Sequence, residues 1–283
     1  MKKFILSVVT ASLLCSTGMM AKTSAEVSKN ALSNAKVEAK DKQVHVIKEA
    51  INAVVLTQKV IADIDKKDTK SAIKDLEDAI GKLEVALSAE HAPKLLPIDA
   101  SVKAVEYVGD AKEIKKSLDL VNDLLNDGKV QEARKLLTTL QSEIDIVSVN
   151  LPVETYPDAL KLAAKYLHED KLQESKAVLV TALNTMIENV VVVPIPVLKA
   201  QALIVAASNI AKEDKKQALK HLTQAQKELE KAKLLGYTSK SDVTYKSLKN
   251  AIEKTKKEVK GKNKAEKLFD ELISKMKSFK DKF

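Results

Sequence analysis

The stretch "ENVVVVPIPVLKAQALIVAAS" (residues 188–208) decides the fold. Its valine run favours extended backbone, whereas Pro194 and Pro196 prevent a preceding helix from continuing. Because proline is tolerated in the first turn of a helix, Pro196 can open the alanine-rich helix that follows. The stretch "IDIVSVNLPVETYPDALKLAAKYL" (residues 144–167) has the same plan, with Pro157 in the first helical turn and Thr155 as its cap. Both stretches predict an extended connector leading into a helix.

Around these connectors, four segments share one apolar spacing. In each, a small residue is followed by leucine four positions later and by another apolar residue seven positions later, which is the pattern of one helical stripe. A second stripe precedes it, beyond a polar turn ("DKKDT", "NDGK", "HEDK" or "KEDKK"). Each segment therefore predicts an antiparallel helical hairpin. The stripes are Ala72/Leu76/Ala79, Ala133/Leu137/Leu140, Ser175/Leu179/Ala182 and Ala218/Leu222/Ala225.

The spacing of the hairpins suggests a repeat. The first residues of the stripes lie 61, 42 and 43 positions apart. We predict a mainly α protein of repeated antiparallel hairpins, with a period of about 42 residues and short extended, proline-marked connectors. The longer first spacing is explained by an irregular segment over residues 93–110. The repeat also predicts that Leu137, Leu179 and Leu222 are buried at equivalent places.

The composition limits the functional classes. The 283 residues are 45% hydrophobic and 31% charged, but only 3% aromatic, with a formal net charge of +9. Arg134 is the only arginine. Because specific reading of phosphates and bases depends on the arginine guanidinium, we expect no nucleic-acid partner.

The N-terminus has the pattern of a secretory signal. Met1-Lys2-Lys3 precedes an apolar run that ends at Cys15, and Ala25 offers a cleavage site. We expect residues 1–25 to be a signal peptide and the protein to be free in the periplasm. The alternative is a lipoprotein anchored at Cys15, but Leu14 stands where a small residue is needed.

Three sequence stretches resemble the YfdX family of exported bacterial proteins: "LPVETYPDALKLAAKYL" (151–167), "VVVPIPVLKAQALIVAASNIAKED" (191–214) and "AKLLGY" (232–237). The resemblance covers roughly residues 30–237. It implies a helical, oligomer-forming periplasmic protein linked to acid and multidrug stress, which binds small drug-like molecules or destabilised clients without catalysis. We accordingly divide the chain into the signal peptide, a YfdX-like domain (26–237) and a C-terminal extension (238–283).

The resemblance supplies no catalytic residues. The positions that carry it are interpreted as structural, with a weaker hypothesis that they contribute to binding: Pro152, Tyr156, Pro157, Pro194, Pro196, Gly236 and Tyr237.

No other pattern indicates catalysis, a metal or a cofactor. Four histidines, His45, His91, His168 and His221, stand apart from one another and from Cys15, whereas a zinc site needs three or four converging ligands. Simple exposed histidines are the favoured interpretation, and pH sensing is the alternative, for which His168 at a helix end is the best candidate. We expect no enzyme activity and no cofactor.

The extension from residue 238 is basic and amphipathic. It holds 14 lysines against 7 acidic residues, a net of +7, together with Phe269, Phe279 and Phe283. Such a helix can bind a membrane surface or an acidic partner. The favoured interpretation is that its apolar stripe packs on the protein's own hairpins or on a second subunit.

Three functional hypotheses follow. The first is a non-enzymatic stress-protection protein that forms a homo-oligomer and binds small hydrophobic ligands or unfolded periplasmic proteins. The second is a helical scaffold at the cell envelope whose basic tail makes the contact. The third, an enzyme of unrecognised type, is the least favoured.

Overall fold

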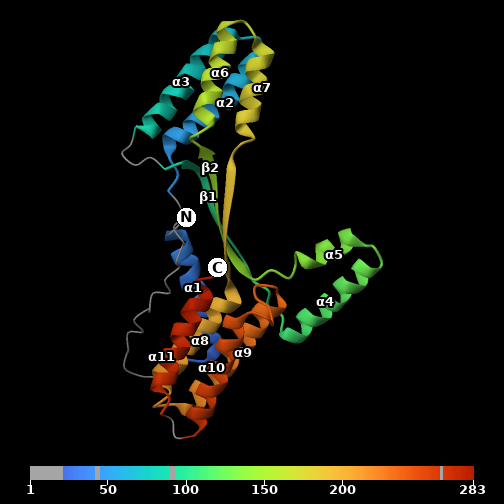
Figure 1. Cartoon of the computed structure of the whole chain (residues 1–283), viewed down its shortest axis with the longest axis vertical. Helices are drawn as coiled ribbons and strands as arrows, with labels where there is room; N and C mark the ends of the chain where they lie inside the picture. The colour runs from blue at the N-terminus through green and yellow to red at the C-terminus, as the bar shows by residue number, and fades with distance from the viewer. Residues whose placement is uncertain (1–21, 42–44, 89–92, 262–263) are drawn as a thin grey trace. The chain divides into compact units, whose positions relative to one another are not determined.

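The fold is mainly helical. The computed structural model describes residues 22–41, 45–88, 93–261 and 264–283. Within these residues, 68% of the chain is helical, and the remaining regular structure is one sheet of three strands. Figure 1 shows these helices and strands. The predicted fold class is confirmed.

The two predicted extended connectors and part of the segment predicted to be irregular (93–110) are strands of that sheet. They are β1 (Leu95–Val105), β2 (Glu143–Pro152) and β3 (Ile187–Pro194), paired in the order β1-β2-β3. The N–H of Val153 donates to the carbonyl of Lys94 (3.2 Å). The N–H of Ile195 donates to the carbonyl of Ser142 (2.9 Å). Because each bond joins the end of one strand to the start of its neighbour, both pairs are antiparallel.

All four predicted hairpins are present. Their helices are α2 (Lys48–Asp65) with α3 (Thr69–Leu87), α4 (Ala111–Asn126) with α5 (Val130–Leu137), α6 (Tyr156–His168) with α7 (Leu172–Leu183), and α8 (Ile195–Ile210) with α9 (Lys215–Leu234).

Three of the hairpin turns have the same backbone geometry. Lys67, Gly128 and Asp170 each adopt a left-handed conformation, with φ of 58°, 73° and 59°. In each turn this residue donates its N–H to the carbonyl three residues earlier, at 2.9, 3.0 and 3.2 Å. The turn of α8–α9 closes differently, by a bond from the N–H of Asp214 to the carbonyl of Ile210 (2.8 Å).

The hairpins are divided between two compact units. Unit 2 comprises residues 42–102 and 146–190, and unit 1 comprises residues 1–41, 103–145 and 191–283. The unit boundaries fall within the three strands. Because two hairpins lie in each unit and are packed in different ways, the regular period of about 42 residues is not confirmed.

Unit 2 is a pair of hairpins with one hydrophobic core. Helix α2 packs against α7, and α3 packs against α6. Leu76, Leu160 and Leu179 are fully buried in this core, together with Tyr156. Lys176 of α7 forms an ion pair with Asp65 of α2, which joins the two hairpins.

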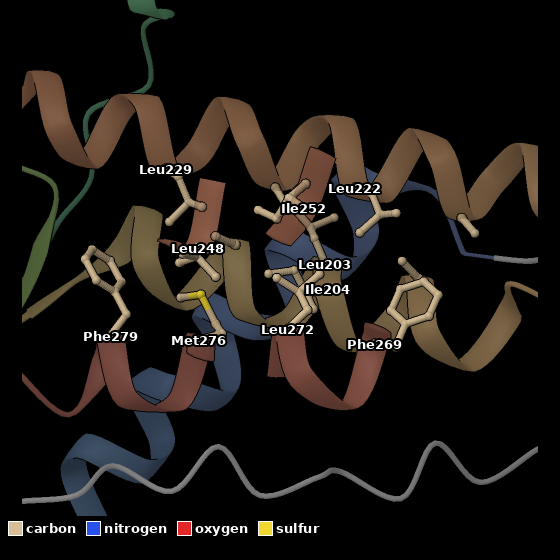
Figure 2. Packing of buried hydrophobic residues seen from close by; sticks show 14 of the residues in the cluster. Leu203, Ile204, Leu222, Leu229, Leu248, Ile252, Phe269, Leu272, Met276 and Phe279 are labelled. Atoms are coloured by element: carbon tan, nitrogen blue, oxygen red, sulfur yellow. The ribbon is translucent and has the colours of Figure 1, made fainter. Parts of the chain in front are cut away.

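Unit 1 surrounds α8 with helices from both ends of the described chain. Helix α1 (Ser24–Asp41), α9 and α11 (Glu266–Lys280) all contact α8, and α10 (Val243–Lys260) contacts α9 and α11. Figure 2 shows how Leu203 and Leu222 meet Phe269 and Met276 in its core. The amphipathic face of the basic extension is therefore covered by the protein's own helices. This confirms the favoured interpretation of the extension.

Candidate functional site

Two of the four connector prolines lie at helix starts, and the other two end strands. Pro157 lies in the first turn of α6, and Pro196 lies in the first turn of α8. Pro152 ends β2, and Pro194 ends β3. Thr155 occupies the predicted cap position of α6, but its side chain makes no capping hydrogen bond.

Tyr156 is part of the core of unit 2. Its hydroxyl donates to Oγ1 of Thr57 on α2 (3.0 Å), and the Thr57 hydroxyl donates to the carbonyl of Ala53 (2.8 Å). Burial raises the pKa of Tyr156 to about 12, so the phenol is neutral at physiological pH. The side chain fixes α6 against α2 and presents no reactive group to solvent.

Gly236 and Tyr237 end α9 and anchor it to the sheet. Gly236 has φ of 88°, a conformation that favours glycine. The N–H of Ser142 donates to the Tyr237 hydroxyl (2.9 Å), and the carbonyl of Ser142 accepts from Ile195 (2.9 Å). Burial raises the pKa of Tyr237, and the Glu143 carboxylate adds to the effect. The structure thus brings Tyr237 close to Ile195 at the start of α8, in unit 1. Pro152, Tyr156 and Pro157 lie in unit 2.

Near Tyr237, two buried oxygens have no hydrogen-bond partner within the described residues. They are Oδ1 of Asp145 and Oγ1 of Thr238. Burial raises the pKa of Asp145, although Lys103 opposes the shift. Across the described part of the chain, no three histidine, cysteine, aspartate or glutamate side chains are grouped to hold a metal ion. These atoms alone define no ligand.

The histidines are not equivalent. His45 and His168 are exposed, and His91 lies outside the described residues. His221 is only 1% exposed, and its Nδ1 is 2.8 Å from Oγ of Ser24 on α1. Burial lowers the pKa of His221, with Lys220 acting in the same direction and Asp214 against it. The favoured interpretation of simple exposed histidines is therefore wrong for His221.

Among the apolar stripes of the four hairpins, the stripe on α4–α5 is the most exposed. Leu125 is 46% exposed, Val130 55% and Leu137 44%. We call these three residues the α4–α5 face. Leu179 and Leu222 are fully buried, as predicted, but the predicted burial of Leu137 is wrong.

The reason for this exposure is the position of the hairpin. Helix α4 contacts α5 and α9, and neither hydrophobic cluster found in the described ranges includes a residue of α4 or α5. Figure 1 shows both helices extending away from α8, α10 and α11 of the same unit. The apolar spacing predicted the stripe on this hairpin, but spacing alone does not indicate which partner covers a stripe.

No helix among the described residues is long and apolar enough to cross a membrane. The geometry defines a class: a mainly helical protein of helical hairpins with a three-stranded antiparallel sheet. One hairpin has an exposed apolar face, and the described residues contain no grouping of metal ligands.

Comparisons with known proteins identify the family of one part of the chain. The family model described as YfdX protein matches residues 53–192, and over these residues the chain is a member of the YfdX family. The match is shorter at both ends than the resemblance over residues 30–237. A solved structure of YfdX from Salmonella Typhi is similar with a TM-score of 0.38 and 14% identity, over 53% of this chain and 93% of that chain. No curated protein matches the chain.

Proposed function

We propose that this protein is a non-enzymatic, periplasmic stress-protection protein that holds apolar segments of acid-destabilised proteins or small apolar molecules. The observation that carries the proposal is the α4–α5 face, because large apolar side chains grouped on a surface mark an interaction site. Membership of the YfdX family over residues 53–192 supports it. The signal-like N-terminus supports export to the periplasm.

The proposed binding is hydrophobic. All three residues belong to one hairpin: Leu125 is near the end of α4, and Val130 and Leu137 are the first and last residues of α5. An extended or helical apolar segment that covers this face removes the three side chains from water, which is favourable in proportion to the apolar area buried. The contact needs no cofactor.

The alternative function, a scaffold whose basic tail makes the contact, receives less support. Phe269, Leu272, Met276 and Phe279 belong to the core of unit 1. An apolar stripe that is already covered cannot bind a membrane or a partner unless α11 leaves that core.

The test is suppression of client aggregation. A client enzyme is unfolded by acid and returned to neutral pH, and its light scattering is followed with the wild-type protein and with Val130→Lys. The matched control is Val85→Lys on α3, because Val85 is 60% exposed and lies in the other unit. We expect suppression by the wild type and by the control, and its loss in Val130→Lys. Equal suppression by all three proteins would show that the α4–α5 face does not bind clients.

A further inference from the structure

Helices α10 and α11 of unit 1 form an antiparallel pair. The ammonium of Lys282, just after the end of α11, pairs with the carboxylate of Asp242 at the start of α10 (2.8 Å). Further along the pair, Nζ of Lys275 on α11 donates to the hydroxyl of Ser247 on α10 (3.0 Å). These two contacts fix which residues of the two helices face one another.

A groove of about 260 Å³ lies between the two helices. We call it the α10–α11 groove. Its walls are one stripe from α10, which runs from Ser247 to Thr255, and one stripe from α11, which consists of Leu268, Glu271 and Lys275. The volume is slightly below the range of about 300–1,000 Å³ that is usual for ligand sites, so it suits a small molecule.

The register orders the charges along the groove. From the contact between Lys275 and Ser247, one turn along the pair leads to Glu271 on α11. A second turn leads to Lys254 on α10, opposite Leu268. The groove therefore presents a positive, a negative and again a positive charge, with an apolar wall beside the second lysine.

These charges are not neutralised by one another. Glu271 and Lys275 are four residues apart on one helix, the spacing of a helical ion pair, but the ammonium of Lys275 is bonded to Ser247 instead. Among the described residues, neither Lys254 nor Glu271 takes part in an ion pair. Two lysines and one glutamate leave the groove with a net charge of +1.

We propose that the α10–α11 groove binds a small amino-dicarboxylate, a molecule with two carboxylates and an ammonium between them, of which glutamate is the simplest probe. One carboxylate accepts from Lys275 and the other from Lys254, while the ligand's ammonium donates to Glu271. The methylene groups of the ligand lie against Leu268. The net charge of −1 on such a ligand complements that of the groove.

This site is independent of the proposed function. It lies on α10 and α11, outside residues 53–192 that match the family model, and it shares no residue with the α4–α5 face. Loss of glutamate binding leaves client binding untouched, and loss of client binding leaves this site untouched.

The first experiment titrates the full mature chain with three related compounds and follows backbone amide shifts by NMR. L-Glutamate has all three charges, glutarate lacks the ammonium, and γ-aminobutyrate lacks one carboxylate. We expect a dissociation constant on the order of 1 mM for glutamate, with shifts confined to α10 and α11. Binding of glutarate and of γ-aminobutyrate should each be weaker by about three- to five-fold, since each lacks one exposed ionic contact. Equal binding of all three compounds, or no shifts up to about 50 mM glutamate, would overturn the proposal.

Charge removal then tests each role. Lys254→Gln and Lys275→Gln should each weaken glutamate binding by about three- to five-fold. Glu271→Gln should abolish the preference for the ammonium, so that glutarate binds at least as tightly as glutamate. The matched controls are Asp270→Asn and Lys277→Gln, because both residues are exposed on α11 and neither lines the groove.

Far-UV circular dichroism shows that each variant is folded. We expect the two controls to bind all three compounds as the wild type does. Folded Glu271→Gln that still prefers glutamate to glutarate, or controls that lose as much affinity as the groove variants, would show that the charges of the groove do not select the ligand.

Discussion

At the scale of single residues, His221 connects α9 to α1. The imidazole is buried, and its Nδ1 shares a hydrogen bond with the Ser24 hydroxyl. Because burial lowers the pKa of His221 in the folded state, the neutral ring is favoured there. Above the unfolded pKa of about 6.5 both states are neutral, and the shift has no effect on stability. As the pH falls below about 6.5, the unfolded state takes up a proton first, so stability decreases until the folded pKa is passed.

We therefore predict that the midpoint of urea unfolding falls between about pH 7.5 and pH 5.5 in the wild type, and falls less in His221→Gln. The glutamine amide is polar and close in size, but does not titrate. His168→Gln is the control, since His168 is exposed on α6. Identical pH profiles for the wild type and His221→Gln would mean that the ring is not protonated on unfolding in this range.

The leucines of the hairpin stripes should differ in their effect on stability. Leu179 and Leu222 are fully buried, and truncation of either to alanine should lower the free energy of unfolding by about 2–5 kcal/mol. Leu137 is 44% exposed, so its truncation should lower the stability of the monomer by only about 0.5 kcal/mol. Urea unfolding at about 1 μM protein separates this from any effect on association. Equal losses at all three positions would show that Leu137 is covered within its own chain.

At the scale of elements, three hairpin turns use a left-handed residue, but only Gly128 suits that conformation well. Lys67 adopts φ of 58° in the same role. A side chain in this region is disfavoured by about 1–2 kcal/mol, which the greater flexibility of glycine in the unfolded state offsets in part. We predict that Lys67→Gly stabilises unit 2 by up to about 1 kcal/mol and that Gly128→Lys destabilises α4–α5 by a similar amount.

Thermal unfolding and hydrogen exchange across each turn measure these effects. Lys66→Gly is the control, because Lys66 has φ of −82° and gains nothing from glycine. A stabilisation by Lys66→Gly equal to that of Lys67→Gly would mean that the left-handed conformation carries no strain.

The start of α1 bears on where the proposed signal peptide would be cut. The Thr23 hydroxyl accepts from the N–H of Glu26 (3.2 Å), and the Glu26 carboxylate accepts from the N–H of Thr23 (2.7 Å). A cut after Ala25 removes this reciprocal cap and Ser24 with it. We predict that a chain beginning at Glu26 is less stable than one beginning at Lys22 by about 1–2 kcal/mol.

Intact mass of the protein recovered from a periplasmic extract tests for a natural cut and locates it. Urea unfolding of the two purified chains measures the difference in stability. Equal stabilities would show that the cap and the Ser24–His221 contact contribute nothing.

Helices, hairpin turns and extended connectors could be predicted from the sequence because each depends on local spacing. His221 was missed, although it stands three residues after Ala218 and four before Ala225, on the buried stripe of α9. Its burial could have been predicted from its position on that stripe. The pairing of the connectors into a sheet, and the packing of both α1 and α11 on α8, depend on residues far apart in the sequence. Periodicity records which face of a helix is apolar, but not which partner covers it, so the open face of α4–α5 could not be foreseen.

At the scale of the whole molecule, two groups of interactions respond to acid in different ranges. The first is His221, below about pH 6.5. The second is formed by carboxylates paired with lysines in unit 1, such as Asp242 with Lys282 (2.8 Å) and Glu266 with Lys212 (2.8 Å). The lysine in each pair lowers the pKa of the carboxylate. The stability from a lowered carboxylate pKa is present above its unfolded pKa, near 4, and is lost as the pH falls through the folded value.

We predict that acid loosens the molecule in this order and dissociates the expected homo-oligomer. Below about pH 4 the carboxylates are neutral while the lysines stay charged, so repulsion between like-charged subunits grows. Light scattering should then report a fall in mass, and a hydrophobic dye should report more apolar surface. His221→Gln should remove only the change between about pH 6.5 and pH 5, and Asp242→Asn should weaken only the change near pH 4. If mass and dye signal both stay constant from pH 7 to pH 3, acid does not control the apolar surface, and binding to it is passive.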